Sequence, residues 1–208
     1  MSDAQLALFV FASLAVIVTP GQDLVLVMSR SIAQGSAAGI ATAAGVSTGL
    51  LGHTLLAGLG LGSLLMASAT LFVVLKLVGA AYLVYLGVRL VLTRASALAL
   101  EAARPAPLRR LFVQGAVSNL ANPKIAIFYF AFLPQFVAAD ASHPTATLLG
   151  LGTAFAALTF LVKGPLGFFA AALAARLRAR PRVLVGMHRA SGAVLIALGV
   201  GLALGRRD

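Results

Sequence analysis

The stretch Thr19-Pro20-Gly21-Gln22-Asp23 interrupts a run of apolar residues near the N-terminus, and Asn119 followed by Asn122-Pro123-Lys124 interrupts a second run in the other half of the chain. Each interruption combines a proline with a charged residue. Proline removes a backbone donor and breaks a helix, and the core of a bilayer offers no water to satisfy the freed backbone groups. Such breaks persist only where protein or a water-filled cavity surrounds them. We therefore expect two broken helices that meet at one site.

The composition of the whole chain is that of an integral membrane protein. Of its 208 residues, 61% are hydrophobic and only 10% are charged, whereas soluble domains are about half apolar and about a quarter charged. A membrane-spanning helix needs roughly 20 apolar residues. We predict an all-α polytopic membrane protein with six transmembrane helices, of which the first and the fourth are broken. The predicted helices cover residues 4–29, 38–62, 69–92, 111–137, 146–174 and 184–205.

The net charge of +11 is distributed in a way that indicates membrane topology rather than nucleic-acid binding. Basic residues gather in the connections after the first, third and fifth predicted helices, and the other two connections contain none. We expect these odd connections to be cytoplasmic, with both termini outside, in an inner (plasma) membrane of the bacterial type whose anionic lipids attract the basic loops. The stretch before the first apolar run contains Asp3 and no Lys or Arg, so we expect no cleaved signal peptide. The basic residues concerned are Arg30, Arg94, Arg104, Arg109, Arg110, Arg176, Arg178, Arg180 and Arg182.

The longest connection divides the chain into two halves of three helices each. Because each half has an odd number of helices, the second half enters the membrane in the opposite orientation. Pro20 and Pro123 then fall in the first helix of each half, which is the pattern of an inverted-topology repeat, and paired breaks of this kind indicate the substrate site of a transporter. We therefore treat 1–208 as a single transmembrane domain, with a first repeat at 1–93, a cytoplasmic linker at 94–110 and a second repeat at 111–208.

Asp23 is a carboxylate within an apolar helix, where it costs about 2.5–3.5 kcal/mol on insertion scales. One interpretation places it in a cavity, beside the N-terminus of a half-helix that begins after Pro20-Gly21 and can hold a substrate carboxylate. The other interpretation places it near the cytoplasmic end, where it only caps the second half-helix, because the apolar run continues no further than Met28.

Lys124 lies deep in the fourth predicted helix, where its ammonium cannot easily reach the interface. Asn119, about one turn earlier, shares its polar face. One hypothesis is that Lys124 and Asp23 meet across the pseudo-twofold axis and line the site. The alternative is a structural ion pair that only joins the two halves.

Two further polar residues lie in predicted helices. His53 can titrate near neutral pH and is a candidate for proton coupling, although a buried histidine more often serves packing. Lys163, followed by Gly164-Pro165, breaks the fifth predicted helix. It is either a second intramembrane charge or a kink residue whose ammonium reaches the interface.

Small residues indicate how the helices pack, and the residue types and motifs that are missing argue against an enzyme or a metal site. Glycines four residues apart, such as Gly45 and Gly49, predict that the second helix packs closely inside the protein. Cysteine is absent, which excludes disulfides and thiolate metal sites. No nucleophile elbow, paired-histidine zinc motif or phosphate-binding loop is present, so we expect no enzyme, no cofactor and no metal site.

Three stretches of the chain resemble the LysE/RhtB family of amino-acid exporters, which includes lysine exporters and homoserine/threonine efflux proteins. They are Thr19-Pro20-Gly21-Gln22-Asp23, Gly79–Gly87 with its two tyrosines, and Phe112–Phe136 with Asn119 and Asn122-Pro123-Lys124. Gly192-Ala193 and Gly199 extend the resemblance over nearly the whole chain. The chain departs from the family pattern at Gln22, where a second proline is usual, and at Lys163, which has no match.

The resemblance implies a six-helix inner-membrane exporter of an amino acid or amino-acid derivative that is driven by the proton gradient and works by alternating access. It places Asp23, Asn122, Pro123 and Lys124 at the site. With the residues argued above, the candidate substrate-binding set is Pro20, Gly21, Gln22, Asp23, Asn119, Asn122, Pro123 and Lys124, and the candidates for proton coupling are Asp23 and His53.

In this arrangement we expect the substrate carboxylate at Lys124 and its ammonium at Asp23. The alternatives are an uncoupled channel for small solutes or ions and a structural membrane subunit. A metal exporter would have only one histidine and one carboxylate inside the membrane as ligands. A homodimer is a further expectation.

Overall fold

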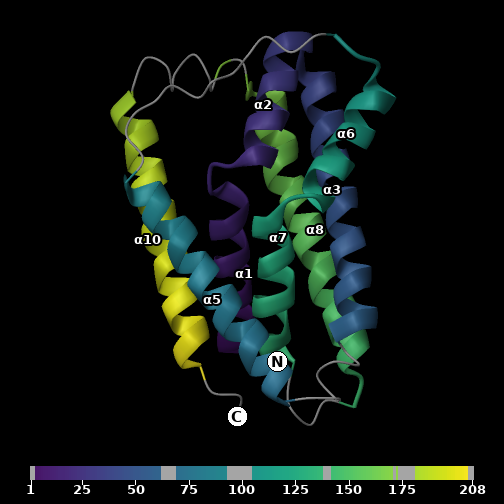
Figure 1. The fold of residues 1–208 in the computed structure, drawn as a ribbon. Helices are drawn as coiled ribbons and strands as arrows, with labels where there is room; N and C mark the ends of the chain where they lie inside the picture. Colours follow the sequence, from purple (N-terminus) through teal and green to yellow (C-terminus); the bar gives the residue numbers. More distant parts are fainter. Residues whose placement is uncertain are drawn as a thin grey trace.

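The computed structural model describes residues 3–61, 69–92, 105–137, 142–170, 172 and 181–205, and every regular element within these residues is a helix (Figure 1). Four helices are each long and apolar enough to cross a membrane. Two bent helix pairs raise the number of spans to six if each pair is one span. The prediction of an all-α polytopic membrane protein with breaks in the first and fourth spans is confirmed.

The helices follow the predicted spans closely. The first span consists of α1 and α2, which bend by 54°, and the fourth consists of α6 and the α7–η3 segment, which bend by 53°. The bounds are α1 Asp3–Val18, α2 Gln22–Gln34, α3 Ser36–Leu56, η1 Ala57–Leu61, α5 Ala69–Leu92, α6 Leu108–Leu120, α7 Pro123–Ile127, η2 Phe128–Phe132, η3 Leu133–Phe136, α8 Pro144–Phe168 and α10 Pro181–Leu204.

Both breaks arise from local sequence. At the first, Pro20 has no amide hydrogen, and Gly21 precedes α2 in an extended conformation with no side-chain cap. At the second, the side-chain oxygen of Asn122 accepts a hydrogen bond of 3.1 Å from the backbone nitrogen of Lys124, and Pro123 occupies the first helical position. Asparagine as cap and proline at the first position are favourable at a helix start, so α7 begins anew after the break.

Corresponding helices of the two halves run in opposite directions, as Figure 1 shows for α1–α2 and α6–α7, for α3 and α8, and for α5 and α10. The start of α1 and the end of α10 lie at the same end of the molecule. These directions are those that an inverted-topology repeat requires, and the division into repeats at 1–93 and 111–208 stays a prediction.

The prediction of a linker at 94–110 needs a correction at its C-terminal end. Residues 108–110 form the first turn of α6, because Pro107 caps this helix and its carbonyl oxygen accepts from the backbone nitrogens of Arg110 and Leu111 at 2.9 and 3.1 Å. The rest of the predicted linker before Pro105 lies outside the described residues, as do Arg94, Arg104, Arg176, Arg178, Arg180 and Asp140. The orientation that we derived from these loops stays a prediction.

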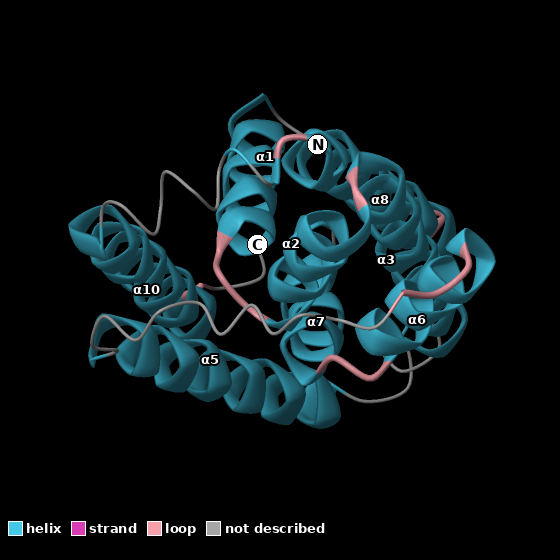
Figure 2. Cartoon of the chain, turned by 90° about the horizontal axis from the view of Figure 1, so that it is seen from above, coloured by secondary structure: helices cyan, strands magenta, loops and turns pink. Residues whose placement is uncertain are grey.

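The helices form two closely packed groups with α1, α2 and α7 between them (Figure 2). On one side, a Cβ atom added to Gly87 of α5 would lie 2.6 Å from the carbonyl oxygen of Gly192 in α10. On the other side, a Cβ added to Gly45 of α3 would clash with the backbone of Phe112 in α6. The predicted close packing of the second span is confirmed. Backbones approach so closely only where the side chain is a hydrogen atom.

Aromatic side chains fill the half of the molecule nearest the termini. Phe128 lies with ring centroids 4.9 Å from both Phe132 and Phe155, and Phe136 lies 5.5 Å from Phe9 of α1. All five rings are buried. We call Phe9, Phe128, Phe132, Phe136 and Phe155 the aromatic cluster. It lies between the breaks and the end of the molecule that carries the termini.

The expected break at Gly164-Pro165 is wrong, because α8 continues through Pro165 and ends at Phe168. Pro165 lies only one turn from the end of the helix, so its missing amide hydrogen removes a hydrogen bond in the last turn instead of dividing the helix. The carbonyl oxygen of Pro165 still accepts from the nitrogen of Phe169 at 2.9 Å. Lys163 therefore lies in a continuous helix.

Candidate functional site

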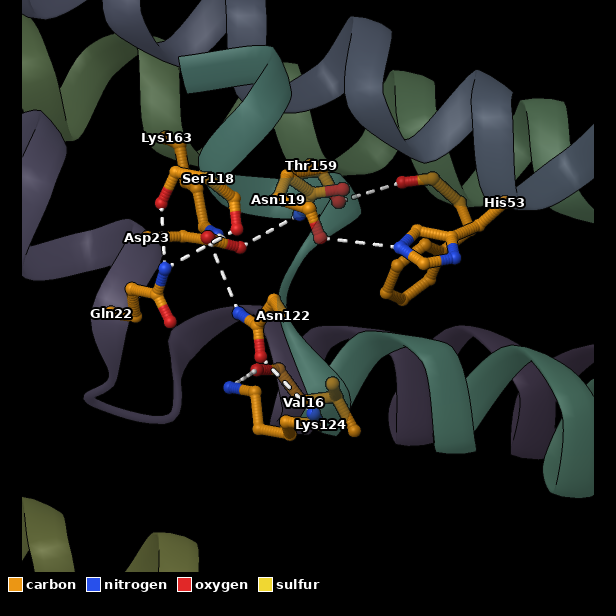
Figure 3. A network of polar contacts seen from close by, with 11 residues as sticks. Val16, Gln22, Asp23, His53, Ser118, Asn119, Asn122, Lys124, Thr159 and Lys163 are labelled. Atoms are coloured by element: carbon orange, nitrogen blue, oxygen red, sulfur yellow. Dashed lines mark hydrogen bonds and ion pairs between the residues drawn. The ribbon is translucent and has the colours of Figure 1, made fainter. Parts of the chain in front are cut away.

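Asp23 lies at the centre of a buried polar network that joins the two halves of the chain (Figure 3). It is the second residue of α2 and only 3% exposed. Asn119 donates to its Oδ2 at 2.8 Å, and Asn122 donates to its Oδ1 at 3.3 Å. Both asparagines flank the second break, so Asp23 joins the two breaks. It lies inside the protein, and its side chain does not cap α2.

The ion-pair partner of Asp23 is Lys163 of α8, whose Nζ lies 3.2 Å from Oδ2. The side chain of Lys163 is 5% exposed and the side chain of Asp23 is 4% exposed. This pair decides between the two interpretations of Lys163, which is a second intramembrane charge. The hypothesis that Asp23 meets Lys124 needs correcting, because α8 brings a different lysine to the carboxylate.

Lys124 lies on the other side of Asn122 from Asp23 (Figure 3). Its ammonium donates to the carbonyl oxygen of Val16, near the end of α1, at 3.2 Å. A Cβ atom added to Gly21 would lie 3.5 Å from this ammonium. Lys124 therefore binds the open C-terminal end of α1 and lies against the first break, so that each break receives a charged residue from the other half.

A cavity of about 380 Å³ opens at the two breaks. The polar residues that line the cavity come from both breaks and include Lys124. Residues of α5 and α10 form the opposite wall. The cavity extends toward the end of α5, with Arg89 and Leu90 at that end. Its full lining is Thr19, Pro20, Gly21, Gln22, Tyr82, Leu86, Arg89, Leu90, Asn122, Pro123, Lys124 and Leu195.

The predicted site residues therefore divide into two layers. Six of the eight candidates line the cavity, namely Pro20, Gly21, Gln22, Asn122, Pro123 and Lys124. Asp23 and Asn119 lie behind them in the buried network. Gln22 also crosses between the halves, since its amide donates to the hydroxyl of Ser118 at 2.9 Å.

His53 belongs to the outer part of the network. Its Nε2 lies 3.2 Å from the carbonyl oxygen of Asn119, and its ring lies 5.6 Å from that of Tyr129. Within the described part of the chain, its Nδ1 and the side-chain oxygen of Asn119 are buried without a hydrogen-bond partner. Asn119 thus lies between His53 and Asp23, and His53 packs against Tyr129. Proton coupling through His53 or Asp23 stays a prediction.

Sequence reasoning missed the wall of the cavity formed by Tyr82, Leu86, Leu90 and Leu195. A signal was present, because the first three residues follow a helical spacing of four and lie on one face of α5. In a membrane helix an apolar stripe normally faces lipid or another helix, so the spacing alone did not distinguish a cavity wall.

Comparisons with known proteins agree with this architecture. Residues 14–206 match the family model of the LysE type translocator. An uncharacterized membrane protein of Pseudomonas aeruginosa is 34% identical over 201 residues, which cover 94% of this chain and 93% of the relative. No solved structure gives a significant match.

Several relatives have names that state a transport activity. The homoserine/homoserine lactone efflux protein of Salmonella typhimurium is 32% identical over 199 residues, covering 95% of each chain. The leucine efflux protein of Salmonella choleraesuis is 28% identical over 162 residues, covering 74% of this chain and 76% of the relative.

Proposed function

Because the chain belongs to the LysE type translocator family, a family of multi-pass membrane proteins, we propose that it exports an amino acid or an amino-acid derivative across the bacterial inner membrane. The substrate class follows from the relatives named for efflux of homoserine, homoserine lactone and leucine.

The cavity at the two breaks carries this proposal. It is polar where the broken helices end, it holds the ammonium of Lys124, and its volume of about 380 Å³ falls within the range of about 300–1,000 Å³ that small-molecule sites have. Discontinuous helices near the middle of the membrane supply backbone groups and helix termini to a substrate, which continuous helices cannot. We place the substrate carboxylate at Lys124, beside the N-terminus of α2.

Alternating access would use the two packed groups of helices. The cavity lies between the breaks and the end of α5, and the buried aromatic cluster would act as the closed gate on the side that carries the termini. Transport to the other side then requires α5 and α10 to move as a pair against α3, α6 and α8. Close packing through Gly87 and Gly192 supports movement of α5 and α10 as one unit.

Proton coupling would act through the buried network. A proton that reaches Asp23 would neutralise its carboxylate and weaken the pair with Lys163, which joins α8 to the first break. Export driven by the proton gradient would use a proton moving inward. A homodimer and contacts between basic loops and anionic lipid remain part of the proposal.

Transport assays in two preparations test the proposed function. Inverted vesicles that contain the overproduced protein are given a panel of labelled amino acids with and without an imposed pH gradient. We expect uptake that exceeds that of control vesicles and increases when the vesicle interior is acidic. Counterflow in proteoliposomes separates the exporter from a channel, since a channel shows no stimulation by substrate on the opposite side. The proposal fails if no amino acid is taken up under either condition.

A further inference from the structure

Asp23 is the one carboxylate that the sequence places inside a predicted membrane span. The five acidic residues of the chain are Asp3, Asp23, Glu101, Asp140 and Asp208. The other four lie near the termini or in connections between the predicted spans. Any ion pair that a substrate ammonium forms at the level of the breaks would therefore have to use Asp23.

The cation position beside Asp23 is already occupied by the chain itself. Lys163 binds Oδ2 at 3.2 Å, Asn119 binds the same oxygen at 2.8 Å, and Asn122 binds Oδ1 at 3.3 Å. Asp23 as a whole residue is 3% exposed and is absent from the cavity lining, where Gln22 and Asn122 stand in front of it. A substrate ammonium would have to displace a tethered ammonium that the fold holds in place.

The cavity in front of Asp23 is lined by positively charged side chains and by apolar side chains. Its charged lining residues are Lys124 and Arg89, and no carboxylate occurs among the described residues that line it. The facing wall carries Leu86, Leu90 and Leu195. A ligand carboxylate is attracted by Lys124, an apolar side chain packs against the leucines, and a second ammonium on the ligand would meet only like charge.

We propose that this site recognises its substrate through the carboxylate and an apolar side chain, without an ionic partner for the α-amino group. This inference rests on the proposed function and names the substrate class of the same cavity. The class comprises neutral amino acids with apolar side chains and their N-acyl and 2-hydroxy counterparts. Basic amino acids are excluded, and so are amides and lactones that lack a free carboxylate.

Counterflow of labelled leucine in proteoliposomes tests this class directly with the unaltered protein. The competitors are N-acetylleucine, 2-hydroxy-4-methylpentanoate, leucinamide, homoserine lactone and lysine. We expect the first two to compete about as well as leucine. The last three should compete at least about tenfold more weakly. Leucinamide and homoserine lactone lose a hydrogen bond between charged groups because they have no free carboxylate, and lysine brings a second ammonium toward Lys124 and Arg89.

The outcomes separate this inference from the proposed function. If leucinamide or lysine competes as well as leucine while N-acetylleucine does not, recognition uses the ammonium and the inference is overturned, although the exporter stands. The same holds if lysine, not leucine, is the amino acid transported. If no amino acid of the panel moves, the proposed function itself fails, and the inference fails with it.

A variant at Lys163 gives a second, reciprocal test. Lys163→Met removes the tethered ammonium, so that Asp23 can pair with a substrate ammonium once Gln22 and Asn122, which stand in front of it, move aside. We expect this variant to discriminate against N-acetylleucine relative to leucine at least about tenfold more than the unaltered protein does. Equal discrimination in both proteins would contradict the role assigned to Lys163. We expect this variant to be less stable, so leucine binding to each purified protein is measured first. If the variant does not fold, the analogue series on the unaltered protein decides.

Discussion

The ammonium of Lys163 lies 3.2 Å from Oδ2 of Asp23, although 140 residues separate the two along the chain. The pair joins α8 to the start of α2, at the point where the first membrane span is broken. It compensates a buried charge that the membrane would otherwise make very unfavourable. In the site that we propose, it also fills the position that a substrate ammonium would need, and Lys124 is then the principal charged group left for the substrate.

Replacing Lys163 by methionine should destabilise the protein strongly. The substitution keeps the length of the side chain and removes its charge, so the Asp23 carboxylate loses its ion-pair partner. Breaking a buried ion pair from one side costs about 3–5 kcal/mol. Thermal unfolding in detergent, followed by the loss of monodisperse protein, measures the effect.

The double variant Asp23→Asn/Lys163→Met is the control for that prediction. It removes both charges together, so we expect it to be more stable than Lys163→Met alone, because no unpaired charge remains. Lys76→Met, which removes a lysine of α5 that makes an exposed hydrogen bond to the carbonyl oxygen of Gly205, should have little effect. A double variant less stable than Lys163→Met would show that the pair does not act as a unit.

A methyl group at Gly45 should disturb the contact between α3 and α6. An added Cβ would overlap the backbone of Phe112, which cannot move aside as a flexible side chain can. Overpacking of this kind typically costs about 1–3 kcal/mol. Gly150→Ala is the matched control, because a Cβ at Gly150 meets no atom within 4 Å. We expect Gly45→Ala to unfold at a clearly lower temperature than the control, and equal unfolding temperatures would contradict the close packing.

Removing the side chain of Asn122 should affect both the helix start and the network. Asn122 caps α7 through Lys124 and also donates to Asp23. Loss of a cap alone costs about 0.5–2 kcal/mol. Asn122→Ala should therefore be less stable than Asn122→Ser, which keeps a capping oxygen. Thermal unfolding of the two variants measures the difference, and equal stability would show that the cap contributes nothing at this break.

The absence of cysteine from the chain allows the cavity to be located by labelling. A cysteine at Leu86 would line the cavity, whereas a cysteine at Val88 would lie on an exposed face of the same helix. We expect a water-soluble thiol reagent to modify Leu86→Cys and leucine to protect it. Val88→Cys should show no protection by leucine. Protection of both positions, or of neither, would place the substrate elsewhere.

Much of the fold could be predicted from the sequence because the bilayer imposes strict lengths. Apolar runs located the spans to within a few residues, and Pro20 and Pro123 marked both bends. Pro165 was misleading because a proline has a different effect in the last turn of a helix than in its middle. The breaks of the first and fourth spans depend on the residue beside each proline as well as on the proline itself. Gly21 precedes the start of α2 and Asn122 caps α7, so these two residues indicated that a new helix begins at each break.

The site could be predicted only in part. The residues at the breaks were identified because polar groups are conspicuous in an apolar run. The partner of Asp23 was not identified, since the choice between Lys124 and Lys163 depends on the rotation of α8 about its axis, which an apolar helix with little amphipathic pattern does not reveal. The leucines of the cavity wall were missed for the same reason, because a cavity wall and a lipid-facing surface are both apolar.

The central claim is that Lys124 binds the substrate in the cavity at the two breaks, and export by Lys124→Met tests it most directly. Leucine transport is measured in inverted vesicles for this variant, for Lys124→Arg and for Lys76→Met, at equal amounts of folded protein. We expect Lys124→Met to lose at least about tenfold in transport at low leucine concentration, as the loss of a charged hydrogen bond requires. Lys124→Arg should retain part of the activity, and Lys76→Met should retain nearly all of it. Unchanged leucine transport by Lys124→Met would contradict the claim.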